Sequence, residues 1–124
     1  QWEYACRAGT ATAYSWGKEI NLKMANYNKS KIGKTSKIGF YQSNPWGLFD
    51  MHGNVWEWVL DWKANYSEGE VSDPEGRALG SLRVRRGGSW GTGGADLRSA
   101  KRNGGSPSSR GYGIGFRVAF QKGK

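Results

Sequence analysis

Large apolar residues occur in short runs along this chain, and long polar stretches separate the runs. Apolar side chains at positions 2, 4, 5 and 6 stand shortly before Gly9, which predicts the end of a short helix within residues 1–8. Residues 10–43 are rich in Lys, Asn, Gly and Ser, a composition typical of loops. Four aromatic residues are expected to hold this loop in place: Tyr14, Trp16, Tyr27 and Tyr41.

Three later stretches have the character of short strands. Two Trp and one Leu alternate with other residues at 56, 58 and 60, and residues 82–86 alternate Leu and Val with Arg. Residues 115–120 are the expected closing strand, and residues 66–80 an exposed loop. Short strands joined by long irregular loops, without internal repeats, predict a single α+β domain over residues 1–124.

The net charge of +9 is concentrated in the last third of the chain. Residues 1–81 carry nine Lys or Arg and nine Asp or Glu, whereas residues 82–124 carry ten Lys or Arg and only Asp96. A basic surface attracts nucleic acids or acidic partners. Alternatively, arginines brace irregular loops, because a guanidinium offers five donors to backbone carbonyls. We favour bracing for four arginines that stand beside apolar residues: Arg86, Arg98, Arg102 and Arg117.

The single cysteine and the single histidine limit the chemistry of the chain. Cys6 can form neither an internal disulfide nor a thiolate metal cluster, and its neighbours predict a small buried apolar residue. His52 is more simply a structural residue than a ligand. No run approaches the ~18 apolar residues of a membrane span. The first residues read as the interior of an element, so we expect the domain to continue upstream of Gln1.

Four motifs, in order, resemble the domain of formylglycine-generating enzymes, a branch of the C-type lectin fold. The motifs are QWEYACRAGT at 1–10, NPWGLFDMHGNVWEWVLDW at 44–62, RVRRGGSW at 83–90 and GFRVAF at 115–120. The resemblance spans nearly the whole chain and implies that fold. Members of the family usually carry a longer segment before the first motif, which agrees with a domain that begins upstream.

The resemblance also implies a calcium site, because four residues match ligands of the family: Asp50, Gly53, Val55 and Glu57. Two carboxylates and two main-chain carbonyls are hard oxygen ligands of the kind that calcium takes, with waters completing about six to eight oxygens. The alternative is that Asp50 caps its turn and Glu57 pairs with a nearby arginine.

The resemblance does not extend to the oxidase chemistry of the family. Catalytic members bind copper through two cysteines, at positions that hold Thr92 and Leu97 here. A hydroxyl and an isobutyl group cannot replace thiolates as ligands of that metal. A related branch uses histidines and iron, but His52 stands alone. We therefore expect no copper and no enzyme activity.

Small residues fill the spaces between large ones in the segment 91–113, and they share a genetic property. Changing only the adenines of an Asn codon yields Gly, Ser, Thr, Ala, Asp and Tyr. This pattern resembles the variable region of a diversity-generating retroelement protein, in which an error-prone reverse transcriptase alters the adenines of a template. Such variable proteins have the same lectin fold and present the altered residues to a ligand.

The resemblance implies a variable, ligand-binding region within residues 91–113, on a scaffold of large residues. Four large residues are expected to be core or turn anchors: Leu97, Pro107, Ile114 and Phe116. The residues expected to vary and to contact the ligand are Gly91, Thr92, Gly93, Gly94, Ala95, Asp96, Ser99, Asn103, Gly104, Gly105, Ser106, Ser108, Ser109, Gly111, Tyr112 and Gly113.

The sequence thus predicts a non-catalytic protein that binds an unknown protein or surface ligand. One alternative is a fixed interaction module of the same fold, and another is a relative of the oxidases that has lost its copper cysteines. A nucleic-acid binder would explain the basic excess, but the variable blocks lack a pattern of basic and stacking aromatic residues. A place at the surface of a cell or phage is implied by the resemblance alone.

Overall fold

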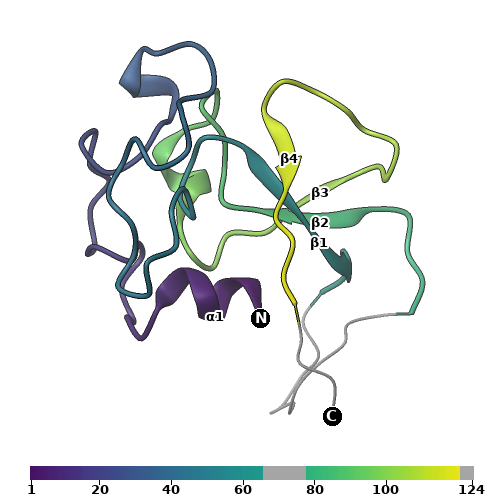
Figure 1. Cartoon of the computed structure of the whole chain (residues 1–124). Coiled ribbons are helices and arrows are strands. Elements are labelled where there is room, and N and C mark those ends of the chain that lie inside the picture. Colours follow the sequence, from purple (N-terminus) through teal and green to yellow (C-terminus); the bar gives the residue numbers. More distant parts are fainter. Residues whose placement is uncertain (66–77, 121–124) are drawn as a thin grey trace.

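The computed structural model describes residues 1–65 and 78–120. In chain order its elements are α1 (Trp2–Arg7), the 3₁₀ turn η1 (Asn28–Ser30), β1 (Trp56–Trp62), β2 (Arg83–Arg86), the 3₁₀ turn η2 (Gly94–Leu97), β3 (Asn103–Gly105) and β4 (Ile114–Phe116) (Figure 1). The short helix, the first two strands and the α+β class are confirmed. Most of the expected loop 66–80 lies outside the described residues.

The four strands form one mixed sheet in the order β3-β2-β1-β4. β1 pairs antiparallel with β2 and parallel with β4, while β2 pairs antiparallel with β3. β3 was not predicted, because its sequence of Asn and two Gly lacks the apolar alternation of a strand.

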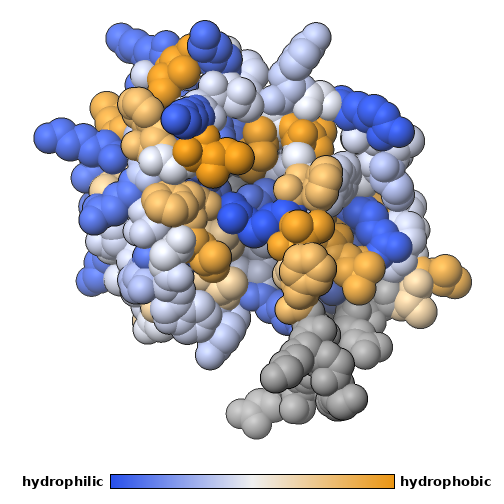
Figure 2. Space-filling model, in the orientation of Figure 1, coloured by the Kyte–Doolittle hydropathy of each residue, from blue (hydrophilic) through white to orange (hydrophobic). Residues whose placement is uncertain are grey.

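The expected closing strand 115–120 is wrong in its extent, since β4 ends at Phe116. The side chain of Arg117 turns back to Glu57 and to the Phe49 carbonyl. Val118 and Phe120 then extend into solvent, 72% and 98% exposed. Figure 2 shows apolar side chains gathered over the end of β4 and the residues that follow.

One face of the sheet is packed, and the other, here called the open face, is half-buried or exposed apart from Trp56 among the described residues. Glu57, Val84 and Arg86 point to the packed face and are 5%, 0% and 8% exposed. α1 covers this face, where the indole Nε1 of Trp2 donates to Glu57 Oε2 at 2.7 Å. Figure 1 shows α1 and the loops of residues 10–55 gathered on one side of the sheet.

The core beside the sheet is built from loop residues. Tyr14, Ala25, Tyr27 and Leu97 form a buried cluster, against which Trp16 packs by stacking on Tyr14 at 5.1 Å between ring centroids. Three of the four predicted aromatic holders, at positions 14, 27 and 41, are buried and the fourth is half-buried. Aromatic burial therefore replaces regular secondary structure in holding this half of the chain.

Two glycines allow three loop segments to meet at this core. A Cβ on Gly53, where φ is +90°, would lie 2.3 Å from the Asn26 carbonyl oxygen. A Cβ on Gly88, where φ is +75°, would lie 2.5 Å from Leu97 Cδ1. Both positions therefore require glycine for space and for backbone conformation.

All four arginines predicted to brace loops donate to backbone carbonyls. The pairs are Arg86 with Ser99 (3.1 Å), Arg98 with Ala95 (3.0 Å), Arg102 with Ala64 (3.1 Å) and Arg117 with Phe49 (2.7 Å). The bracing interpretation is confirmed for these residues. None of the described helices has the length and apolar character needed to cross a membrane.

Candidate functional site

The predicted variable region forms two loops, one around η2 and one between β3 and β4. The first loop begins at Trp90, whose N–H donates to the Asn54 carbonyl at 2.9 Å. The Thr92 carbonyl accepts from the Asn28 N–H at 3.1 Å, which ties this loop to the first half of the chain. Leu97 closes the loop, with its side chain wholly inside the core.

The second loop is a turn followed by an exposed tip. The Ser109 N–H donates to the Ser106 carbonyl at 2.8 Å, and the Gly113 carbonyl accepts from the Trp56 N–H at 2.8 Å. The two loops meet where the indole Nε1 of Trp90 donates to the Tyr112 carbonyl at 3.3 Å. The tyrosine side chain itself is 94% exposed. The meeting point makes one continuous surface from the two loops.

Most of the predicted variable residues reach this surface. Six are exposed: Gly91, Ala95, Ser106, Ser108, Gly111 and Tyr112. Nine are half-buried: Thr92, Gly93, Gly94, Asp96, Asn103, Gly104, Gly105, Ser109 and Gly113. Asp96, the acid of this region, forms an ion pair of 3.2 Å with Lys101.

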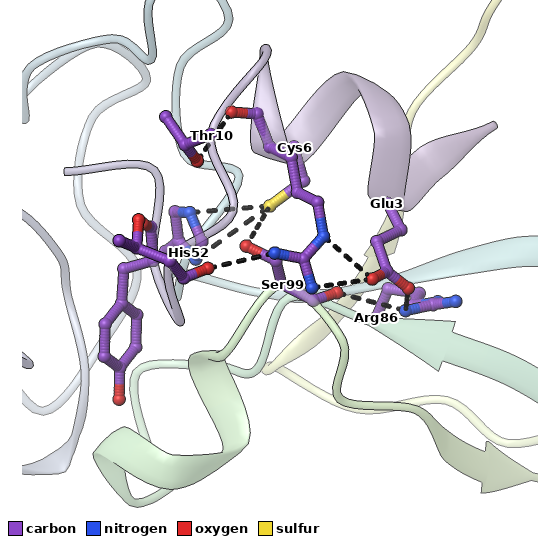
Figure 3. A network of polar contacts seen from close by, with 9 residues as sticks. Glu3, Cys6, Thr10, His52, Arg86 and Ser99 are labelled. Carbon is purple, nitrogen blue, oxygen red and sulfur yellow. Dashed lines mark hydrogen bonds and ion pairs between the residues drawn. The ribbon is translucent and has the colours of Figure 1, made fainter. Parts of the chain in front are cut away.

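Ser99 contradicts the prediction, because it has no exposed surface. Its N–H donates to the Ala13 carbonyl at 2.8 Å, and its carbonyl accepts from Arg86 at 3.1 Å. Its hydroxyl lies 3.7 Å from the Cys6 sulfur (Figure 3). Ser99 is therefore a small core residue beside α1 and cannot contact a ligand. The codon pattern missed this because it records residue type and not the direction of a side chain.

The glycines of the variable region differ in whether a side chain would fit at their positions. A Cβ on Gly91 or Gly93 would meet nothing within 4 Å. A Cβ on Gly94 would lie 2.9 Å from Ile20, and one on Gly105 would lie 2.8 Å from the ring of Trp58. At Gly104 the nearest atom, at 2.5 Å, belongs to the flexible Lys63 side chain. Exchange is therefore free at some positions and requires repacking at others.

The predicted anchors are correct only in part. Leu97 is fully buried and Ile114 is half-buried. Pro107 is exposed, but it is a turn anchor, because it lies in the turn that the Ser109 N–H closes on the Ser106 carbonyl at 2.8 Å. Phe116 is 77% exposed and is not a core anchor. Phe116 lies on the open face of the sheet, opposite Trp58.

Of the four predicted calcium ligands, Asp50 and Glu57 interact electrostatically, but Glu57 is already engaged. Its carboxylate accepts from Trp2 at 2.7 Å and from Arg117 Nε and Nη2 at 2.7–3.1 Å. Asp50 accepts from the Gly39 N–H at 3.2 Å, and burial raises the pKa of its carboxyl group. The alternative of an arginine pair for Glu57 is thus realised, and calcium would have to displace that pair. Calcium binding stays a prediction.

The positions of the copper cysteines hold side chains with structural roles. Leu97 fills the core, and the Thr92 hydroxyl donates to the Ser89 carbonyl at 3.0 Å while accepting from the Ser89 N–H at 2.9 Å. Cys6 is fully buried, and burial raises the pKa of its thiol to about 12, which leaves it inert.

His52 is a satisfied structural residue, as predicted. Its Nε2 accepts from the Ser15 N–H at 3.1 Å, and its Nδ1 therefore donates to the Leu97 carbonyl at 2.6 Å. Burial lowers the pKa of the imidazole and keeps it neutral. The ring also lies 3.4 Å from the Cys6 sulfur, so it helps to join α1 to the core (Figure 3).

The model of the sulfatase-modifying factor enzyme 1-like domain matches residues 1–122. The chain belongs to this family. The family resemblance carried by the four motifs is therefore confirmed. Among curated relatives, a serine/threonine-protein kinase pkn1 of Chlamydia caviae is 40% identical over 124 residues, which are 96% of this chain and 20% of the relative. A formylglycine-generating enzyme of Streptomyces coelicolor is 35% identical over 138 residues, 96% of this chain and 44% of that enzyme.

Solved structures of similar proteins include a variable protein. Treponema denticola variable protein 1 has a TM-score of 0.85 and 35% identity, covering 93% of this chain and 43% of that protein. PvdO from Pseudomonas aeruginosa has a TM-score of 0.81 and 37% identity, covering 93% of this chain and 48% of that protein. The chain thus spans less than half of each of these relatives. The lectin-like fold and the likeness to a variable protein are both confirmed.

Sequence reasoning missed Trp90 and Arg85 as parts of the site. Trp90 joins the two loops, and Arg85 faces Asn103 across the β2–β3 pair. The alternation of arginines in 82–86 was a usable signal for Arg85, because it places Arg83 and Arg85 on one face of the strand. No signal in the sequence pairs Trp90 with a carbonyl 22 residues away.

Proposed function

We propose that this domain is a non-catalytic recognition module whose two loops, within 91–98 and 103–113, bind a protein or surface ligand and are diversified by a retroelement. The proposal depends on one observation: the segment contains both fully buried positions and exposed positions. Leu97 and Ser99 are fully buried, whereas six of the residues predicted to vary are exposed. Exposed loop positions tolerate exchange within about 0.5 kcal/mol, while core exchanges cost several.

The surface offers one large aromatic contact surrounded by small polar side chains that can adapt to a ligand. Tyr112 offers a stiff aromatic ring at low entropic cost, and serine and asparagine side chains supply hydrogen bonds around it. The main chain of Tyr112 lies where the two loops meet, since its carbonyl accepts from the Trp90 indole. A ligand that covers Tyr112 would therefore lie close to the first loop. The similarity to a variable protein of Treponema denticola supports the same role.

The DNA downstream of the coding sequence tests diversification directly. We expect a near-copy of the codons for residues 81–120, with adenines at the variable positions, beside a reverse-transcriptase gene. The codon for Ser99 should then carry no adenine difference, because exchange there disturbs the core. A locus without such a repeat would leave the fixed interaction module as the better explanation.

The absence of catalysis is proposed on donor chemistry. Thr92 and Leu97 cannot bind copper as thiolates do, and Cys6 is buried with its thiol protonated. Copper titration with an oxygen-consumption assay on a thiol peptide tests this point. Stoichiometric copper binding with turnover would overturn it.

A further inference from the structure

The open face of the sheet carries a cluster of residues that the variable region does not explain. Register places Arg85 opposite Trp58 on β1 and opposite Asn103 on β3. Arg83 lies opposite Trp62 and Gly105 on the same face. We name Trp56, Trp58, Trp62, Arg83 and Arg85 the arginine–tryptophan face. Predicted variable residues Asn103 and Gly105 form its border.

The two guanidinium groups of this face rest on indole rings. The Arg83 guanidinium carbon is 3.7 Å from the centre of the Trp62 ring, and that of Arg85 is 5.4 Å from the centre of the Trp56 ring. Such stacking fixes the plane of a guanidinium and shields one side from water. The groups are therefore oriented before any ligand arrives.

The Nε donor of Arg85 has no hydrogen-bond acceptor among the described residues. Its Nε is buried and is the one buried side-chain nitrogen or oxygen without a partner among the described residues. In the part of the chain that the structure describes, no carboxylate pairs with Arg83 or Arg85. Arg83 donates once, to the Leu60 carbonyl. Both side chains are half-buried and keep their charge without a carboxylate partner among the described residues, so their charge fits an anionic ligand.

We infer that the arginine–tryptophan face binds the carboxylates of an extended acidic segment of a partner protein. This inference rests on the proposed recognition function and names the chemistry of the partner. The Arg83 and Arg85 guanidinium groups lie over rings at opposite ends of β1, so they are spread along the strand and fit carboxylates distributed along an extended acidic peptide. A guanidinium binds a carboxylate in a bidentate manner.

The surroundings favour a peptide over a nucleic acid. Trp56 is 4% exposed and Arg83 covers one face of the half-buried Trp62 ring, so these two rings offer less surface to a stacking base than free aromatic rings do. Phe116, 77% exposed, borders the face and suits an apolar side chain between the acids. Single-stranded DNA is therefore the competing outcome in the test.

The test measures binding of an acetylated and amidated (Glu-Ser)4 peptide to the intact chain by tryptophan fluorescence at low salt. We expect (Gln-Ser)4 and oligo(dT) to bind at least about tenfold more weakly. Arg85→Gln should weaken (Glu-Ser)4 binding about tenfold, and Arg85→Lys, which keeps the charge, by about threefold. Arg110→Gln removes the same charge from the exposed loop and should change binding less than about twofold.

Three results would overturn the inference: no binding of (Glu-Ser)4 to the parent chain, tighter binding of oligo(dT), or equal weakening by Arg85→Gln and Arg110→Gln. Thermal melting verifies that each variant is folded, and Arg85→Lys carries the test if Arg85→Gln does not fold. The DNA locus tests diversification, whereas (Glu-Ser)4 binding tests the arginine–tryptophan face. Failure of diversification and failure of the arginine site are thus separately visible.

Discussion

The guanidinium of Arg117 holds both carboxylate oxygens of Glu57 across 60 residues of chain, with Nη2 and Oε1 2.7 Å apart. The Glu57 side chain is 6% exposed, whereas that of Arg117 is 34% exposed. This pair attaches the chain after β4 to the beginning of β1. It also explains why the strand predicted to run on to residue 120 stops at Phe116.

Arg117→Gln should lower the free energy of unfolding by about 2–4 kcal/mol, because it leaves a buried carboxylate without its cation. Urea denaturation followed by tryptophan fluorescence measures the change. Arg110→Gln, which removes an exposed charge, is the matched control and should stay within about 0.5 kcal/mol. Equal effects of the two variants would contradict a structural role for the Arg117–Glu57 pair.

Calcium binding by Asp50, Gly53, Val55 and Glu57 competes with Arg117 for the same carboxylate. If calcium binds there, its stabilising effect should be larger in Arg117→Gln, in which the oxygens of Glu57 are free. The measurement compares melting temperatures in millimolar calcium and in chelator for both proteins. Melting temperatures that calcium shifts in neither protein would count against the site.

Ser99 and Ser106 test the boundary between the core and the recognition surface. Tyrosine at position 99 would have to enter a site with no exposed surface, so Ser99→Tyr should destabilise by about 3 kcal/mol or more. Ser106→Tyr points into solvent and should change stability by less than about 0.5 kcal/mol. Chemical denaturation of the two variants decides the matter, and similar stabilities would show that the boundary is misplaced.

Two glycines of the region make a second matched pair. A Cβ at Gly105 would lie 2.8 Å from the Trp58 ring, whereas one at Gly91 would meet nothing within 4 Å. Neither glycine has a positive φ, so the comparison isolates space from backbone strain. Gly105→Ser should cost about 1–3 kcal/mol and shift the tryptophan emission, and Gly91→Ser should do neither. An unshifted emission with unchanged stability in Gly105→Ser would mean that Trp58 moves aside freely.

The sequence predicted those features that local pattern or recognisable motifs determine. Alternation predicted β1 and β2, and the lone Cys6 and His52 were correctly assigned to the core. The motifs predicted the fold because close approaches, as at Gly88 against Leu97, demand particular residues.

What the sequence did not predict depends on contacts between distant segments. The sequence Asn103–Gly105 becomes a strand only because β2 offers it a pairing edge. Ser99 is a small residue like its exposed neighbours, but hydrogen bonds to Ala13 and Arg86 hold it in the core. Both depend on partners at least 13 residues away, beyond the reach of a local pattern.

The neutral state of His52 should make stability depend on pH. Its Nε2 accepts from the Ser15 N–H, so protonation there would break this bond inside the core. Burial lowers the folded-state pKa of the imidazole below the value of about 6.5 in the unfolded chain. Between these two values the unfolded chain binds more protons than the folded one. The stabilisation that His52 contributes is therefore complete above about pH 6.5. Below that pH the free energy of unfolding decreases, by at most about 1.4 kcal/mol per pH unit.

Denaturation of the parent chain and of His52→Gln between pH 7 and 5 measures this slope, because glutamine does not titrate. Asp50, whose pKa burial raises, contributes a slope of opposite sign at lower pH, but it does so in both proteins and cancels in the difference. We expect the two curves to converge as the pH falls. NMR titration of the imidazole, the only one in the chain, gives the folded pKa without a variant. Parallel denaturation curves, or a histidine that titrates near 6.5 in the folded protein, would refute the buried neutral tautomer.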